Sequence, residues 1–186
     1  LPYLLLAAPA GFLADRYSKR NVIFGCKIAE IIIMGLGTLS IVLGNIWILF
    51  IAVALMGAQS ALFSPAKLGS VPELLRSDRI SLANALFGLT TVVATVAGMA
   101  IGSRLADITG YRGQEHWQWS GITLITIAII GTLLSLLVRR VPAANPTRKF
   151  PWNAATQTYR DLRTLSASGP LLRVALGIVF FWSVGG

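Results

Sequence analysis

The chain has 186 residues, of which 55% are hydrophobic and only 12% are charged, and its mean hydropathy is +0.71. These values lie outside the range of soluble globular domains and predict an all-α membrane protein. The formal net charge of +9 would suit a nucleic-acid-binding protein, but the basic residues fall in gaps between apolar runs. They therefore indicate membrane topology, and no nucleic-acid partner is expected. A single cysteine, Cys26, excludes a disulfide framework or a cysteine-rich metal site.

The apolar runs can be divided by the length that a membrane requires. A hydrocarbon core of about 30 Å needs about 20 helical residues to cross it. Four complete spans are predicted, at residues 22–43, 46–66, 80–103 and 117–138. Partial spans flank them at residues 1–14 and 171–186. We therefore expect a fragment that holds the end of one membrane helix, four whole helices and the start of another.

The basic residues predict which loops face the cytoplasm, because short cytoplasmic loops carry an excess of Lys and Arg. Most of these residues lie in the connections 15–21, 71–79 and 139–170, which we expect to be cytoplasmic. The connection at residues 44–45 has no charge, and the one at 104–115 has two basic and two acidic residues. Three tryptophans at this outer edge are predicted interfacial anchors: Trp47, Trp117 and Trp119.

The polar stretch at residues 139–170 is a predicted central loop between two bundles. Residues 1–138 would form part of an N-terminal transmembrane bundle, and residues 171–186 the start of a C-terminal one. Prolines interrupt the beginning of the loop. Apolar residues then recur at helical spacing, at Trp152, Ala155, Tyr159, Leu162 and Leu165. They predict a short amphipathic helix, which either rests on the anionic inner leaflet or is a solvated connector.

A charged segment between the first two apolar runs carries the clearest motif. The segment Gly11-Phe-Leu-Ala-Asp15-Arg16-Tyr-Ser-Lys19-Arg20 resembles the major facilitator superfamily signature Gly-x-Leu-Ala-Asp-Arg-x-Gly-Arg/Lys-Arg/Lys. Ser18 stands where that family usually has Gly. The resemblance implies a twelve-helix transporter, of which this chain would contain the end of helix two, helices three to six, the central loop and the start of helix seven.

The chemistry of the same segment suggests a gate. A carboxylate near a helix end can accept hydrogen bonds from backbone N–H groups or from an arginine, and so form a latch between helices. Alternating access needs such a latch to open. We assign this gating role to Gly11, Asp15, Arg16, Lys19 and Arg20. Gly11 would permit close helix approach. In the alternative interpretation, the three basic residues only fix the membrane topology.

A second resemblance points to the lysophospholipid transporter branch of the superfamily. It rests on Phe63-Ser64-Pro65-Ala66-Lys67, Pro72-Glu73-Leu74, Leu82-Ala83-Asn84-Ala85-Leu86 and Leu105-Ala106-Asp107, with Ala85 where the branch has Gly. It implies movement of lysophosphatidylethanolamine and related lipids from the outer to the inner leaflet of the bacterial inner membrane. Some members are fused to an acyltransferase, but no His-x-x-x-x-Asp motif of that enzyme occurs here, so we expect no enzymatic activity.

Ionisable residues inside the predicted spans are candidate functional groups, because their burial in lipid is costly. Lys27 and Glu30 share a helix face and would form a pair, either structural or coupled to a proton or Na⁺. Lys67 follows Pro65, which would kink or end the helix. Lys67 would then turn inward to bind a lipid phosphate or, in the alternative, snorkel to the membrane edge.

Polar neutral residues complete the predicted substrate site. Gln59 and Asn84 would line the cavity with Lys67, although hydrogen bonding between helices is the alternative for Gln59. Gly98 and Gly102 would permit close helix packing. No metal or cofactor is expected, since His116 has no second ligand nearby. Three functions remain open: lysophospholipid flipping by alternating access, export of a drug or sugar, and membrane anchoring of a fused acyltransferase.

Overall fold

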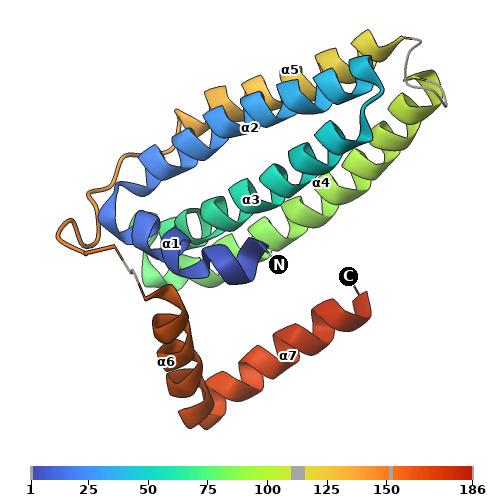
Figure 1. Ribbon diagram of the computed structural model, residues 1–186. Coiled ribbons are helices and arrows are strands. Elements are labelled where there is room, and N and C mark those ends of the chain that lie inside the picture. The colour runs from blue at the N-terminus through green and yellow to red at the C-terminus, as the bar shows by residue number, and fades with distance from the viewer. Residues whose placement is uncertain (1, 110–115, 151–152, 186) are drawn as a thin grey trace. The chain divides into compact units, whose positions relative to one another are not determined.

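A computed structural model describes residues 2–109, 116–150 and 153–185 (Figure 1). Within these ranges the chain forms helices and no strand, which confirms the all-α prediction. The elements are α1 (Pro2–Arg16), α2 (Lys19–Leu43), α3 (Ile46–Leu74), the 3-10 turn η1 (Ser77–Arg79), α4 (Ile80–Thr109), α5 (Trp117–Ser135), α6 (Ala154–Ala167) and α7 (Gly169–Gly185).

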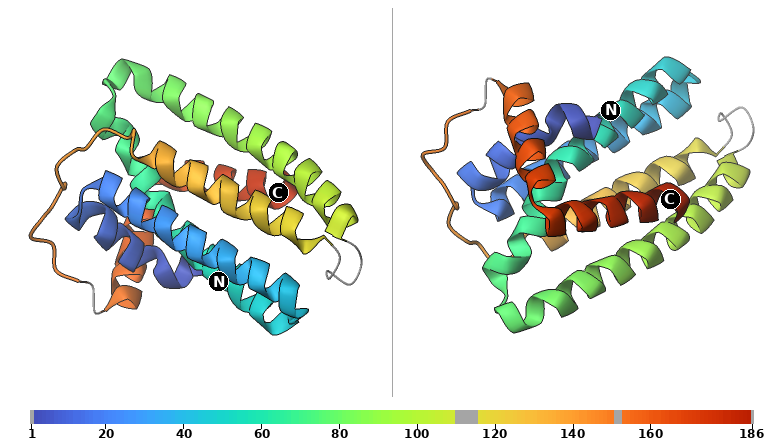
Figure 2. Two further views of the ribbon diagram at one scale, coloured as in Figure 1. Left: turned by 90° about the horizontal axis from the view of Figure 1, so that it is seen from above. Right: turned by 90° about the horizontal axis from the view of Figure 1, so that it is seen from below.

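The chain divides into two units, residues 1–148 and 149–186. In the first unit the helices run back and forth between two ends (Figures 1 and 2). The α1–α2 turn, the α3–α4 connection and the segment after α5 lie at one end, and the α2–α3 turn lies at the other. The segments 19–43, 46–74, 77–109 and 117–135 are long and apolar enough to cross a membrane. A multi-pass membrane protein follows.

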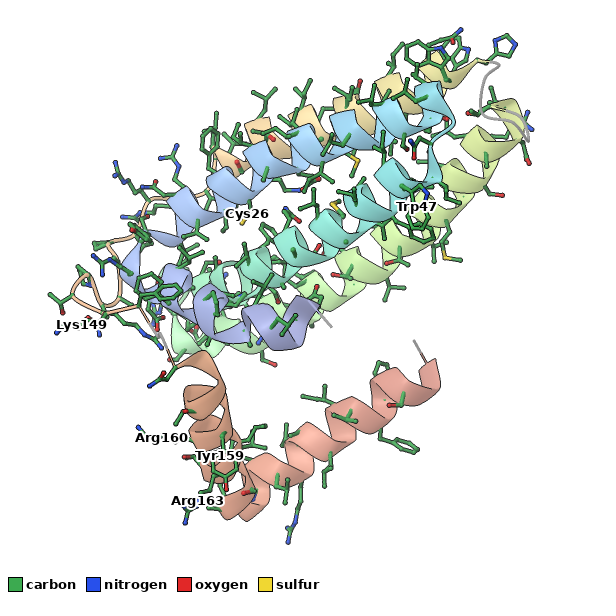
Figure 3. All side chains as sticks on the ribbon, in the orientation of Figure 1. Cys26, Trp47, Lys149, Tyr159, Arg160 and Arg163 are labelled. Carbon is green, nitrogen blue, oxygen red and sulfur yellow. The ribbon has the colours of Figure 1, made fainter. Side chains whose placement is uncertain are left out.

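The exposed tryptophans of the first unit gather at the end opposite the charged α1–α2 turn. Trp47 is the second residue of α3 and is 74% exposed (Figure 3). Trp117 and Trp119 belong to the first turn of α5, which begins at the same end (Figure 1). Amphipathic indoles favour the depth of the lipid headgroups. The three residues thus share one end of the unit, and their role as interfacial anchors stays a prediction.

Several helix ends differ from the predicted spans. The expectation that α3 ends near Pro65 is wrong, because the helix continues through Pro65 and Pro72 to Leu74. Proline removes one backbone hydrogen-bond donor. In an apolar segment that lies in lipid, however, the remaining backbone N–H and C=O groups find hydrogen-bond partners only inside a helix. The helix α4 likewise runs beyond residue 103 to Thr109, whereas α5 stops at Ser135 instead of residue 138.

The longer helices shorten two of the predicted loops. Residues 71–74 belong to α3, so the connection expected at 71–79 begins at Leu75 and contains η1. The loop expected at 15–21 is a tight turn, because only Tyr17 and Ser18 separate α1 from α2. The charged residues of the signature segment are therefore held on helix ends instead of in a loose loop.

A two-residue turn fixes how α2 and α3 face each other. Gly44 ends α2 in the left-handed conformation, with φ of 61°, which glycine adopts without steric cost. The side chain of Asn45 then caps α3 by accepting hydrogen bonds from the backbone N–H groups of Trp47, at 2.9 Å, and Ile48, at 3.4 Å. The short turn makes α2 and α3 antiparallel neighbours, which brings Glu30 opposite Gln59.

Two glycines, Gly69 and Gly121, lie where helices pack closely against each other. The sequence analysis had suggested Gly11, Gly98 and Gly102 for this role. A Cβ atom at Gly121 of α5 would lie 2.6 Å from Cγ2 of Thr38 on α2, and one at Gly69 of α3 would lie 2.9 Å from Cε of Lys19. Among the described residues, no atom lies within 4 Å of such a Cβ at Gly11, Gly98 or Gly102. The close approach expected at these three positions is therefore not present within the described part of the chain.

Replacement of Gly121 by alanine is expected to lower the stability of the first unit. The new methyl group would overlap Thr38, whose rotamer is held because Oγ1 donates a hydrogen bond to the Met34 carbonyl at 2.9 Å. Overpacking of this kind costs about 1–3 kcal/mol. Thermal unfolding of the full-length protein in detergent measures the effect. Gly88→Ala is the matched control, since nothing lies within 4 Å of its Cβ; an equal effect of both variants would contradict the packing account.

The second unit consists of α6 and α7, which pack on each other. The helix predicted in the central loop is present as α6, where Tyr159 and Leu162 are exposed beside Arg160 and Arg163 (Figure 3). Trp152, which the same prediction includes, lies outside the described residues. The predicted contact of α6 with the inner leaflet stays a prediction.

Candidate functional site: the helix turn and the polar cluster in the membrane

The signature segment occupies the end of α1, the tight turn and the beginning of α2. Asp15 is the penultimate residue of α1, and Ser18 precedes α2 with φ of −55° and ψ of 127°. This backbone conformation is open to any L-residue, so serine replaces the glycine of the superfamily signature without strain. The departure from the signature at this position leaves the turn intact.

Asp15 is held by an arginine from the segment after α5. Its carboxylate forms an ion pair with Arg148, and its backbone carbonyl accepts a hydrogen bond from the Asn145 N–H at 2.8 Å. Nη1 of Arg16 donates to the Arg148 carbonyl at 2.7 Å, and Nη2 of Arg20 donates to the Leu136 carbonyl at 2.9 Å. The segment after α5 is thus bound to the turn by four contacts, which we call the Asp15–Arg148 latch.

Lys19 links the same turn to the end of α3. It is only 6% exposed, although it is charged, and it forms an ion pair with Glu73. Its alkyl chain packs over Gly69, which has no side chain to obstruct it. Removing one partner of a buried ion pair is costly, so Lys19 and Glu73 depend on each other. Arg16, Lys19 and Arg20 therefore all make tertiary contacts in addition to contributing positive charge to the turn.

Sequence reasoning missed Arg148 and Glu73 as partners of the signature segment. Arg148 lies in the basic connection 139–170 and Glu73 in the motif Pro72-Glu73-Leu74, and the sequence analysis assigned a partner to neither. Each partner lies far along the chain from the turn, and no local spacing connects them. The one available signal was charge: Arg148 is opposite in charge to Asp15, and Glu73 is opposite in charge to Lys19. Many other residues of the chain carry the same charges, so this signal does not single out a partner.

A second set of polar residues lies among the membrane-spanning helices. Nζ of Lys27 donates to Oε2 of Glu30 at 2.7 Å, which confirms the predicted pair within α2. Glu30 is 9% exposed, and its Oε2 also accepts from Nε2 of Gln59 on α3, at 3.3 Å. On α5, Oγ1 of Thr132 donates to the Lys27 carbonyl at 3.2 Å. These four residues form a polar cluster that joins α2, α3 and α5.

A cavity of about 520 Å³ lies beside this cluster, among α1, α2 and α3. Its walls are mostly aliphatic and include Leu13, Val22, Ile33, Leu55 and Leu62. The polar side chains that reach it are Tyr17, Asn21 and Gln59. Cys26 lies on the side of α2 that faces α3 (Figure 3). The cavity has the size and the apolar lining of a site for a small lipophilic ligand.

Lys67 and Asn84 lie away from this cavity. Lys67 is half-buried on α3, and its Nζ is 5.3 Å from the ring centroid of Phe87 on α4, a cation–π contact. No carboxylate among the described residues forms an ion pair with Lys67. Asn84, one turn before Phe87, is exposed. The structure therefore does not bring Lys67, Asn84 and Gln59 together into one site.

Within the described residues, no group of three His, Cys, Asp or Glu side chains lies close enough to hold a metal ion. His116 stands immediately before α5 with a positive φ of 56° and is exposed.

Comparison with known proteins adds a family and a set of relatives. The family model described as Major Facilitator Superfamily matches residues 1–186. The lysophospholipid transporter LplT of Pectobacterium carotovorum is 30% identical over 98% of this chain, and that of Klebsiella pneumoniae is 27% identical over 98%. The human protein spinster homolog 1 is 26% identical over 94%. The chain spans 42%, 43% and 33% of these relatives, respectively. No solved structure matches the chain significantly.

Proposed function

Because the chain belongs to the major facilitator superfamily, we propose that its full-length protein moves lysophospholipids across the bacterial inner membrane by alternating access. The similarity to proteins named lysophospholipid transporter, over 98% of this chain, supports this substrate. Since the chain covers less than half of those relatives, transport is an activity of the whole protein, to which this segment contributes one part.

The observation that carries the proposal is the burial of Lys67 without a carboxylate partner among the described residues. This cation is half-buried at the inner part of α3, next to the Phe87 ring, and no described carboxylate neutralises it. A membrane protein retains such a charge at a cost, which a functional role explains. The phosphate of a lysophospholipid would supply the missing negative charge through a charge-assisted hydrogen bond. The single acyl chain would remain against apolar helix faces.

We assign the Asp15–Arg148 latch to the gating step. The latch joins the signature turn to the segment that leads out of the first unit, and a change of state requires contacts that form in one state and break in the other. An ion pair with side chains 40% and 27% exposed can exchange its partner for water more cheaply than a fully buried pair. The proposal places the signature turn and residues 139–148 on the cytoplasmic side, in accord with their excess of basic residues.

Two other functions are less well supported. Export of a drug or a sugar is compatible with the superfamily alone, but it gives no reason for a lysine inside the membrane that pairs with no carboxylate among the described residues. Anchoring of a fused acyltransferase would need no charged residue inside the membrane, and Lys27, Glu30 and Lys67 are all such residues. The relatives carry the names of transporters, which also favours transport.

Uptake of labelled lysophosphatidylethanolamine tests the proposal. Cells without a transporter of their own, expressing the full-length protein, are expected to accumulate the label at least about tenfold faster than cells with an empty vector, a difference equivalent to about 1.4 kcal/mol. Labelled diacyl phosphatidylethanolamine is the control substrate. Equal accumulation with and without the protein would contradict lysophospholipid transport and would favour the drug or sugar reading.

A further inference from the structure

We propose that Gln59 recognises the free glycerol hydroxyl of a monoacyl lipid in the cavity among α1, α2 and α3, and that Glu30 and Lys27 position Gln59 for this role. The inference rests on the proposed function, which supplies the substrate class, and adds the group that separates monoacyl from diacyl lipids. Glu30 and Lys27 become positioning residues instead of a coupling site for a proton or Na⁺.

The orientation of the Gln59 amide follows from its neighbours. Nε2 lies 3.1 Å from the Cys26 carbonyl oxygen and 3.3 Å from Oε2 of Glu30. Both neighbours can only accept hydrogen bonds, so the amide group must turn its nitrogen toward them. Both N–H groups are then in use. The amide oxygen is left to act as an acceptor, and within the described part of the chain it receives only a long hydrogen bond, of 3.4 Å, from the Ser60 hydroxyl.

Glu30 can hold Gln59 in place because Lys27 keeps its charge compensated. The Lys27 ammonium lies 2.7 Å from Oε2 of Glu30 and 5.6 Å from the centroid of the Phe63 ring. The alkyl chain of Lys27 packs over Gly131 of α5. Oε2 of Glu30 thus accepts from both Lys27 and Gln59, which ties the Gln59 amide to the pair on α2.

The cavity is suited to one acyl chain with a small polar group beside it. Its volume of about 520 Å³ lies within the range of ordinary ligand sites, and its walls are mostly aliphatic. Gln59, which is only 6% exposed, is the polar side chain in its α3 wall. By helix rise, Gln59 lies about 20 Å from the start of α3, which places it inside the membrane. A donor bound here would find few competing waters.

The free hydroxyl is the group that distinguishes a lysophospholipid from a diacyl lipid. A hydroxyl can donate a hydrogen bond to the Gln59 oxygen, whereas the ester that replaces it in a diacyl lipid can only accept. Two acceptors facing each other in an apolar site leave both unsatisfied, which is costly. A site built on an acceptor thus selects for the hydroxyl and against the second chain.

Lys67 acts elsewhere along α3. It lies eight residues beyond Gln59, about 12 Å by helix rise, and faces Phe87 of α4. The Gln59 oxygen and the Lys67 ammonium would therefore meet the lipid in different positions of its passage. Substitutions at the two positions should combine additively, because distant sites without shared partners do so.

The test compares lysophosphatidylethanolamine with an analogue in which hydrogen replaces the free hydroxyl. Binding to the purified full-length protein in detergent and uptake into cells are both measured for each lipid. The unsubstituted protein is expected to prefer the hydroxyl-bearing lipid about tenfold, the size of one retained hydrogen bond. Gln59→Leu should remove this preference by weakening binding of the natural lipid alone. Gln118→Leu, an exposed glutamine on α5, is the matched control.

Two double variants separate positioning from coupling. Lys27→Met with Glu30→Gln removes both ionisable groups but keeps an acceptor for Gln59, and the preference for the hydroxyl should persist. Lys27→Met with Glu30→Leu removes the acceptor as well, and the preference should fall to that of Gln59→Leu. Adding Gln59→Leu to the second double variant should have no further effect on the preference, because these residues act through one oxygen.

Two results would overturn the inference. A preference for the hydroxyl that survives Gln59→Leu would show that another group recognises it. Uptake whose dependence on the proton or Na⁺ gradient disappears in the Lys27→Met, Glu30→Gln variant would return Glu30 to the role of a coupling site. Failure of the proposed function has a different signature, since the unsubstituted protein would then bind and take up neither lipid.

Discussion

Replacing Asp15 by asparagine is expected to reduce lysophospholipid uptake to less than about a tenth of that of the unsubstituted protein. The variant should still insert into the membrane, because the four predicted spans and the basic residues that orient them are unchanged. Initial uptake rates, normalised to the amount of protein in isolated membranes, measure the effect. The change is small in volume, so the result reports on charge.

The expected size follows from the contacts that Asp15 makes. Its carboxylate pairs with Arg148, whose carbonyl in turn accepts from Arg16 at 2.7 Å. Hydrogen bonds to charged groups contribute about 1.5–3 kcal/mol, and asparagine retains only the neutral part of this interaction. A state that loses about 1.4 kcal/mol relative to its alternative changes its population about tenfold. A transporter that cycles between two states of similar free energy is sensitive to such a shift.

Two further variants give the result its meaning. Asp78→Asn is the matched control, since Asp78 pairs with Arg76 at 3.6 Å on the surface, where their side chains are 63% and 89% exposed. An exposed pair of this kind contributes little, so uptake should be unchanged. Exchange of the charges, Asp15→Arg with Arg148→Asp, should restore part of the uptake lost in either single variant. Uptake by Asp15→Asn at the level of the Asp78→Asn control would contradict the latch.

The periodic and local features of this chain were predictable from its sequence. Runs of apolar residues gave the number and order of the spans, because lipid imposes a fixed length on a helix. The Lys27–Glu30 pair followed from a spacing of three residues, which places both side chains on one helix face. The end of α3 was misjudged, since the rule that proline ends a helix holds less strictly where the backbone has no water to bond with.

The tertiary partners were not predictable in the same way. The Asp15–Arg148 and Lys19–Glu73 pairs join residues that are distant in sequence. Gln59 lines a cavity, but without Lys67 and Asn84, and its amide bonds to Cys26 and Glu30 on α2, as the alternative of hydrogen bonding between helices predicted. Which face of α3 meets α2 depends on the geometry of the turn at Gly44 and Asn45, and single-sequence patterns do not contain that rotation.

Lys67→Ala is expected to have the second large effect, a fall in uptake of at least about tenfold with little change in membrane insertion. If the ammonium binds the lipid phosphate, its loss leaves a phosphate without a partner in a site of low dielectric constant. The fall should appear mainly as weaker binding, and Lys67→Arg should retain part of the activity because it keeps the positive charge. Lys149→Ala, at an exposed lysine, is the matched control.

A variant without the charge and a lipid without the phosphate together distinguish phosphate binding by Lys67 from a role in packing. The Lys67 ammonium also lies over the Phe87 ring, so Lys67→Met is needed to keep the apolar part of the side chain while removing the charge. A packing role predicts that Lys67→Met transports normally, and such a result would reduce Lys67 to a snorkelling residue. A phosphate role predicts that Lys67→Met fails like Lys67→Ala. It also predicts that an uncharged monoacylglycerol, which lacks the phosphate, binds equally well to purified Lys67→Met and to the unsubstituted protein, since the ammonium has no partner on that lipid.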